Sequence, residues 1–222
     1  MITPTYTFET KLLPNYRLIA GIDEVGVAPL AGPVVSAAVI LNPEKIGRYR
    51  SKTKWWYGVR DSKILSARKR ESMIDFIKQN ADDYGIGLAS HKEIDELNIR
   101  EATLLAMRRA VENMKIIPEV ALIDGRFKIY DLRFKIRQVT IVDGDALVLS
   151  IAAASILAKV YRDDLMKNYA QKFPAYGFEK HKGYDTDFHR KNLLRYGPCE
   201  IHRMTYQTVK DIMNERWGAR VV

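Results

Sequence analysis

The pattern that most constrains the fold is an alternation of short apolar segments with longer helical ones. Residues 17–23, 119–124 and 137–142 have the apolar composition of buried strands. Helical periodicity fills residues 98–115, before the second of these strands, and residues 147–166, after the third. Strands that are connected through helices pair in parallel, because the helix crosses one face of the sheet to bring the chain back. The sequence therefore predicts an α/β fold in which helices flank a sheet.

Two further strands are expected in the N-terminal half. Residues 33–41 form a second apolar run, and the turn-rich residues 24–32 separate it from the strand at 17–23. A short connection of this kind predicts that these two strands form an antiparallel pair. Residues 84–90 are expected to form a third strand of this half.

Helix boundaries are marked by residues with capping chemistry. Ser66 is a suitable N-cap for one helix, and Asn98 opens the next. The C-terminal segment is basic, aromatic and turn-rich. It is expected to contain one short helix, which begins near Asp185 or Thr186 and ends at Gly197.

Net charge narrows the class of partner. Lys and Arg number 36 against 27 Asp and Glu, which gives a formal net charge of +9. This balance favours a polyanionic partner, first nucleic acid and then an acidic membrane surface, although a basic soluble protein without such a partner has the same balance. No apolar run is long and unbroken enough to span a bilayer, so we expect no membrane association through a spanning helix.

The single cysteine, Cys199, excludes an internal disulfide bond and a zinc site built from cysteines. A lone thiol is typical of a reducing compartment. The N-terminus lacks the basic start and apolar run of a signal peptide. The expected location is therefore cytoplasmic.

Acidic residues follow three of the predicted strands. Asp23 and Glu24 end the first, Asp124 ends the strand at 119–124, and Asp143 and Asp145 follow the strand at 137–142. Ends of neighbouring strands meet at one edge of an α/β sheet, so these acids are candidates for a cluster. Clustered carboxylates repel one another unless a hard divalent cation bridges them, and Mg²⁺ or Mn²⁺ suits oxygen ligands. The alternative is that each acid is a solvated turn residue or a helix cap.

Other catalytic patterns are absent from the sequence. It contains no GxxxxGK[ST] or GxGxxG phosphate-binding loop, its four histidines lack the HExxH spacing, and no serine stands in a nucleophile elbow. Phosphodiester hydrolysis with two ions held about 4 Å apart is the chemistry that the acids best fit.

Six motifs, in the same order along the chain, resemble those of the ribonuclease HII family, and the resemblance covers residues 17 to about 210. The motifs are GIDEVG at 21–26 with PLAGPVVSAAVIL after it, DSKILS at 61–66, EIDELNIREATLLAMRRAV at 93–111, LIDG at 122–125, AAASILAKVYRD at 152–163 and HKGYDTDFH at 181–189. The resemblance implies a ribonuclease H-like fold, with a mixed five-stranded sheet flanked by helices and a C-terminal helical extension that binds substrate. It places the catalytic domain at residues 1–170 and the extension at 171–222.

The activity implied by this resemblance is hydrolysis of the RNA strand of RNA–DNA hybrids and nicking of duplex DNA at embedded ribonucleotides. The products would carry 5′-phosphate and 3′-hydroxyl ends. Four carboxylates would hold Mg²⁺ or Mn²⁺, and they correspond here to Asp23, Glu24, Asp124 and Asp145. The partners would be the RNA–DNA hybrid and ribonucleotide-containing DNA duplex, and the protein would act as a monomer.

Two departures from the family pattern stand close to these acids. The family has Lys-Gly-Asp-Ser where this chain has Asp143, Gly144, Asp145 and Ala146, so Asp143 adds a negative charge that could compete for the metal or face solvent. The family loop Gly-Arg-Gly, which contacts the ribonucleotide at the RNA–DNA junction, reads Gly26, Val27, Ala28 here. The loop has therefore lost a cation and gained a methyl group.

Other substrate contacts are retained. Lys63 resembles the family's phosphate-contacting lysine, and Tyr184 resembles the aromatic residue that packs on the sugar beside the cleaved bond, although a core aromatic is the simpler alternative for Tyr184. Residues 45–60 hold six basic residues among aromatic ones, which suits either nucleic-acid contact or a folded-back surface loop.

Two rival functions remain open. A catalytically weakened hybrid-binding protein of the same fold would explain the changes at Val27, Ala28 and Asp143. A different metal nuclease, such as a resolvase-like enzyme, would fit the acids but not the six ordered motifs.

Overall fold

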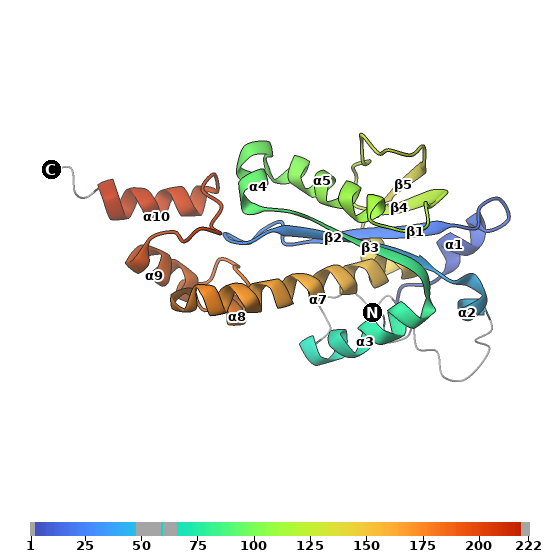
Figure 1. Ribbon diagram of the computed structural model, residues 1–222, viewed down its shortest axis with the longest axis horizontal. Coiled ribbons are helices and arrows are strands. Elements are labelled where there is room, and N and C mark those ends of the chain that lie inside the picture. The colour runs from blue at the N-terminus through green and yellow to red at the C-terminus, as the bar shows by residue number, and fades with distance from the viewer. Residues whose placement is uncertain (1–2, 48–58, 60–65, 219–222) are drawn as a thin grey trace. The chain divides into compact units, whose positions relative to one another are not determined.

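The computed structural model describes residues 3–47, 59 and 66–218, and Figure 1 shows the course of the chain. Its contacts divide the chain into two compact units, each built from separate stretches. The first unit comprises residues 1–25, 35–88 and 103–160, and the second comprises residues 26–34, 89–102 and 161–222. The boundary predicted at residue 170 separates a catalytic region from a substrate-binding region. Chain contacts do not test such functional roles, so this boundary stays a prediction.

The first unit carries a five-stranded sheet with the strand order β3-β2-β1-β4-β5. Strand β1 pairs antiparallel with β2 and parallel with β4, and β4 pairs parallel with β5. The mixed sheet and the antiparallel pair expected from the sequence are therefore confirmed. The strands are β1 (Ile19–Val25), β2 (Val34–Leu41), β3 (Ala81–Ala89), β4 (Val120–Asp124) and β5 (Arg137–Ile141).

Helices cover both faces of this sheet, as Figure 1 shows for α5 (Ile99–Glu112) and α7 (Leu149–Lys172). Alternation along β1 sends Ala20 and Ile22 to the face that packs on α5, and Ile19 to the face that packs on the start of α7. Central strands that are buried on both faces are apolar almost throughout. This is why the strand segments read as continuous hydrophobic runs in the sequence.

The helix N-caps predicted from the sequence can be compared with those in the structure. Ser66 caps α3 by accepting a hydrogen bond from the Lys69 amide, and Thr186 caps α9, which ends before Gly197, so these predictions are confirmed. The remaining helical elements are α1 (Thr7–Leu12), α2 (Pro43–Gly47), α3 (Ala67–Asn80), α4 (His91–Leu97), α6 (Gly144–Leu147), the 3₁₀ turn η2 (Pro174–Tyr176), α8 (Phe178–His181), α9 (Asp187–Tyr196) and α10 (Gln207–Gly218).

The start of a helix at Asn98 is confirmed, because α5 begins at Ile99 and the Asn98 side chain accepts hydrogen bonds from the Arg100 and Glu101 amides. The sequence reasoning missed the preceding helix α4 and was wrong about the C-terminal segment. The C-terminal segment holds more than one short helix, since α8 and α10 accompany α9. Short helices of four residues have almost no periodicity to detect, which explains why α8 escaped prediction.

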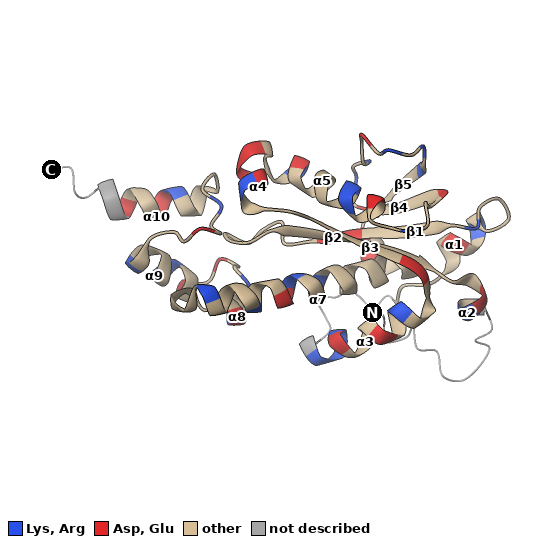
Figure 2. Cartoon of the chain, viewed as in Figure 1, with Lys and Arg blue, Asp and Glu red and all other residues tan. Residues whose placement is uncertain are grey.

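The second unit contains the loop at residues 26–34, helix α4 and the C-terminal helices, and the loop and the C-terminal helices share two small cores. One core joins Ala31 and Met166 to Tyr176, Phe178 and Ile201. The other joins Leu30 to α9 and α10. Basic residues are distributed over several elements of this unit, α8 and α9 among them (Figure 2). In the described part of the chain, no helix has the length and apolar character needed to cross a membrane.

Candidate metal centre and substrate-binding loops

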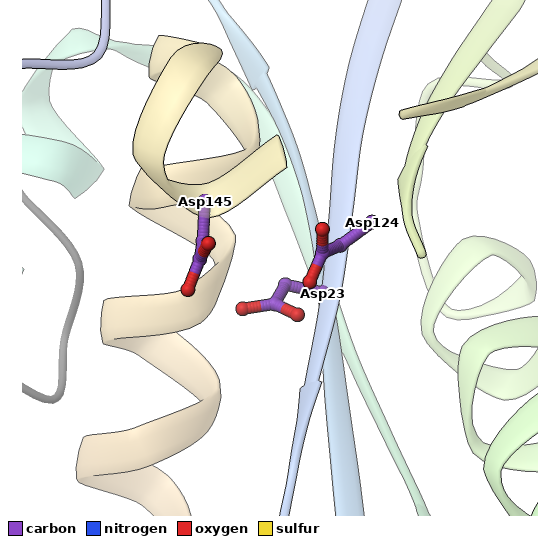
Figure 3. Close-up of side chains that lie close together, drawn as sticks. All are labelled: Asp23, Asp124 and Asp145. Atoms are coloured by element: carbon purple, nitrogen blue, oxygen red, sulfur yellow. The ribbon is translucent and has the colours of Figure 1, made fainter. Parts of the chain in front are cut away.

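Neighbouring parallel strands bring two of the predicted acids together in the first unit. The register of β1 and β4 pairs Ile22 with Ile123, so the residues that follow, Asp23 and Asp124, are neighbours at the same end of the sheet. Figure 3 shows their carboxylates close together. The parallel pairing that the sequence predicted is thus what places these two side chains side by side.

Asp145 joins them from the short helix α6, which follows β5. The turn before it is fixed by the Gly144 amide, which donates a 2.7 Å hydrogen bond to Oδ1 of Asp124. A Cβ atom at position 144 would lie 2.7 Å from Cδ1 of Ile151, so a larger residue there would force the Ile151 side chain to shift. One carboxylate oxygen from each of the three aspartates lies within 4.8 Å of the others.

The cluster is electrostatically costly for a protein without a cation. Asp23 is only 4% exposed and Asp145 only 7% exposed. Burial raises the pKa of Asp23 well above its ordinary value, the charges of Glu24 and Asp124 raise it further, and a hydrogen bond from Ser155 opposes the rise. A bound divalent cation would relieve this repulsion and offer oxygen-preferring coordination. The three aspartates therefore fit a divalent metal.

Glu24 and Asp143 lie outside this set of three. The Glu24 amide donates a 2.7 Å hydrogen bond to Oδ1 of Asp23, and the charge of the Glu24 carboxylate raises the pKa of Asp23. Asp143 is exposed, has a left-handed backbone with a φ of 55°, and makes no capping hydrogen bond with its side chain. The assignment of Glu24 as a metal ligand stays a prediction, as does the choice of Asp145 over Asp143.

That choice is open to a direct comparison. We expect Asp145→Asn to lower the rate of hybrid cleavage at least about tenfold more than Asp143→Asn, because even residues that only support metal ligands cost roughly 10- to 100-fold when removed. Rates are measured at saturating metal for both variants. A larger loss in Asp143→Asn would transfer the ligand role to that residue.

In the second unit, the loop that contains Gly26, Val27 and Ala28 is held by its carbonyl oxygens. Arg203 donates from Nη2 to the Gly26 carbonyl at 2.6 Å and from Nη1 to the Val27 carbonyl at 2.8 Å. The Tyr206 hydroxyl donates to the same Val27 carbonyl at 2.6 Å. Gly26 itself has a φ of 95°, and a Cβ atom there would lie 2.2 Å from the Arg162 side chain.

Arg162 holds the other end of the same loop. Its Nε donates to the Pro33 carbonyl at 2.9 Å and its Nη2 to the Ala31 carbonyl at 3.2 Å. Burial, and then the charge of Arg203, lower the pKa of Arg162 to about 10, so it remains a cation at neutral pH. With its carbonyls turned toward the two arginines, the loop keeps the Val27 and Ala28 amides free of any hydrogen bond to the described residues.

Tyr184 belongs to the same unit and has an exposed ring. Its side chain lies over the guanidinium of Arg162, with 5.9 Å between that group and the ring centroid, and the residue is 37% exposed. Its amide donates to the His181 carbonyl at 2.9 Å. The alternative of a core aromatic therefore does not describe Tyr184, and the ring is accessible to a ligand.

Arg162, Arg203 and Tyr206 were missed by sequence reasoning. Their partners in the loop at residues 26–33 are backbone carbonyls 129 to 179 positions away in the chain, so no local spacing could reveal these contacts. Lys63 and nearly all of the basic aromatic segment at 45–60 lie outside the described residues. Their predicted roles stay predictions.

Comparisons with known proteins agree with this geometry. The family model described as Ribonuclease HII matches residues 20–209. A ribonuclease HII from Endomicrobium trichonymphae is 49% identical over 216 residues, which cover 97% of this chain and 98% of that protein. A ribonuclease HII from Syntrophotalea carbinolica is 47% identical, and 96% of each chain is covered. The solved ribonuclease H2 from Pyrococcus horikoshii OT3 is 27% identical, with a TM-score of 0.72 over 89% of this chain and 98% of that one.

Proposed function

Because the chain belongs to the ribonuclease HII family, we propose that it hydrolyses the RNA strand of RNA–DNA hybrids with Asp23, Asp124 and Asp145 as the residues that hold its metal. The observation that carries the proposal is the convergence of these three carboxylates at one end of the sheet. The protein is an endoribonuclease, and it depends on a divalent metal. The choice of Mg²⁺ or Mn²⁺, the participation of Glu24 and the use of two ions belong to the proposal.

The chain's own residues prepare the site for this chemistry. The Gly144 amide fixes one oxygen of Asp124, and hydrogen bonds from the Glu24 amide and from Ser155 hold the Asp23 carboxylate. When bound, two divalent ions supply an activated water and stabilise the leaving oxygen of a phosphodiester. Attack on the phosphorus with departure of the 3′-oxygen gives the proposed 5′-phosphate and 3′-hydroxyl ends.

Substrate recognition is assigned to the second unit. The amides of Val27 and Ala28 and the exposed ring of Tyr184 offer donors and a flat apolar surface for a ribose and its phosphate. A 2′-hydroxyl distinguishes RNA from DNA at such contacts, so nicking at embedded ribonucleotides forms part of the proposal. Lys63 is proposed as a further phosphate contact. A monomeric state and a cytoplasmic location are proposed from the family resemblance and the lone thiol.

A catalytically weakened binding protein is the competing function. The substitutions at Val27, Ala28 and Asp143 motivated it, but the three clustered aspartates are the residues that hydrolysis needs, and they are retained. No observation favours the binding function over the enzyme.

One assay tests the proposed function. The protein is incubated with end-labelled RNA–DNA hybrid, DNA duplex carrying one ribonucleotide, plain DNA duplex and single-stranded RNA, with Mg²⁺, Mn²⁺ or excess chelator. We expect cleavage of the RNA strand of the hybrid with either metal and none in chelator. Cleavage of single-stranded RNA at a rate equal to the hybrid, or full activity in chelator, would contradict the proposal.

A further inference from the structure

Two buried histidines of the second unit have no part in the function described so far. His189 lies on α9 with 0% of its surface exposed, and His202 precedes Arg203 with 1% exposed. Their Nε2 atoms are 3.1 Å apart, and the ring of Phe178 packs against both. A hydrogen bond between two imidazole nitrogens requires one ring to donate and the other to accept.

The partners at the far ends of the two rings fix the direction of this bond. Three groups of Cys199 lie near Nδ1 of His202: the amide at 2.9 Å, and the carbonyl oxygen and the thiol sulfur at 3.2 Å each. The amide can only donate and makes the shortest of these contacts, so Nδ1 of His202 accepts. The Tyr184 carbonyl can only accept, and it lies 2.9 Å from Nδ1 of His189, so that nitrogen donates. A neutral imidazole carries one N–H, which leaves Nε2 of His202 as the donor and Nε2 of His189 as the acceptor.

The Cys199 amide and the Tyr184 carbonyl therefore require the same assignment of donors and acceptors on the two rings. That assignment holds only while both imidazoles are neutral. Burial lowers the pKa of His189 to about 4, and burial together with the neighbouring His189 lowers the pKa of His202 to about 3. Each ring is therefore neutral at physiological pH. The chain of bonds runs from the Cys199 amide through His202 and His189 to the Tyr184 carbonyl.

This series of hydrogen bonds ends at Tyr184, the residue that the proposed function places against the substrate sugar. The Tyr184 backbone is fixed at both sides, because its amide donates to the His181 carbonyl and its carbonyl accepts from His189. The residue before it is also held, since the Gly183 carbonyl accepts from the Leu30 amide at 2.8 Å. Tyr184 is thereby tied to the same loop that Arg203 grips through Gly26 and Val27.

We propose that His189, kept in one tautomer by His202, is a positioning residue that fixes Tyr184 for contact with the ribose of the substrate. The inference rests on the proposed function, which makes Tyr184 a substrate contact. His189 acts through Tyr184 and does not itself touch the substrate. Its removal should weaken substrate binding more than it slows the chemical step.

Two substitutions at position 189 separate this role from simple core filling. In His189→Asn, the side-chain amide occupies the place of Nδ1 and retains a donor for the Tyr184 carbonyl. In His189→Gln, the amide occupies the place of Nε2, so the bond to Tyr184 is lost while an acceptor for His202 is kept. We expect His189→Gln to raise KM for the hybrid about two- to tenfold, the range for one neutral hydrogen bond. Its kcat should change less than twofold, and His189→Asn should stay near the unmodified KM.

A double-mutant cycle with Tyr184→Ala supplies the decisive comparison. If His189 acts through Tyr184, the KM effect of His189→Gln disappears when the ring is absent. Equal KM changes in the two His189 variants, or an effect that persists undiminished in Tyr184→Ala, would overturn the inference. An unmodified protein that fails to cleave the hybrid in the same assay would instead contradict the proposed function.

A second pair of variants serves if the His189 variants do not fold. His202→Gln retains an N–H near the place of Nε2 and keeps the His189 tautomer, whereas His202→Leu removes that donor. KM is expected to rise about two- to tenfold in His202→Leu relative to His202→Gln. Equal KM values in these two folded variants would overturn the inference as well.

Discussion

Asp23→Asn and Asp124→Asn are each expected to lower the rate of hybrid cleavage by at least about 100-fold. Removal of residues that merely support metal ligands costs roughly 10- to 100-fold, and these two residues are proposed as ligands themselves. The fold should survive, because an amide of the same shape replaces a carboxylate in a cluster whose charges repel. Initial rates with saturating Mg²⁺ or Mn²⁺ measure the effect, and circular dichroism measures the fold.

The same variants have a readout that does not depend on activity. In chelator, Asp23→Asn should unfold at a temperature no lower than that of the unmodified protein, because the substitution removes a buried charge beside Asp124. Asp75→Asn is the matched control, since Asp75 is an exposed residue of α3 and the chemical change is identical. Asp23→Asn with the same cleavage rate as this control would refute the assignment of Asp23 to the metal.

The three clustered acids were predictable because the sheet obeys simple rules. An apolar strand that ends in an acid could be recognised at Asp23 and at Asp124, and parallel pairing then required the two strand ends to be neighbours. The contribution of α6 was less accessible. Asp143 and Asp145 follow the same strand, and only the backbone of the turn, with Asp143 at a positive φ, determines which one faces the cluster.

Helix boundaries show how local signals can be present and yet overlooked. Ser90 and Glu93 form a reciprocal capping box at the start of α4, which is a pattern that sequence alone displays. The prediction instead followed the longer periodic segment after Asn98. By contrast, the start of α5 was predicted correctly, because Asn98 has capping chemistry and its side chain accepts from the Arg100 and Glu101 amides.

The polar interior of the second unit could not have been predicted from spacing. Arg203 and Arg162 are fully buried, which is rare for arginine, and both are satisfied by carbonyls of the loop at residues 26–33. His189 and His202 are likewise satisfied by each other and by main-chain groups. Such contacts depend on tertiary structure, so a sequence offers no way to distinguish these residues from ordinary surface ones.

The altered loop leads to the second large expectation. Restoring the family's Gly-Arg-Gly with the double substitution Val27→Arg and Ala28→Gly should raise nicking at a single embedded ribonucleotide by at least about tenfold relative to cleavage of continuous hybrid. A charge-assisted hydrogen bond is worth about 1.5–3 kcal/mol, and each 1.36 kcal/mol in the transition state corresponds to about tenfold in rate. Rates on the two substrates are compared in the same buffer.

The structure explains why this substitution should be tolerated and why its effect should be selective. Val27 is 39% exposed and its carbonyl is already held by Arg203 and Tyr206, so a longer side chain extends outward without disturbing the backbone. A continuous hybrid offers many registers, whereas an isolated ribonucleotide offers one 2′-hydroxyl and one adjacent phosphate. Val27→Met with Ala28→Gly controls for side-chain length without charge. A gain that is equal on both substrates, or that the methionine control reproduces, would mean that the loop's missing cation does not govern discrimination.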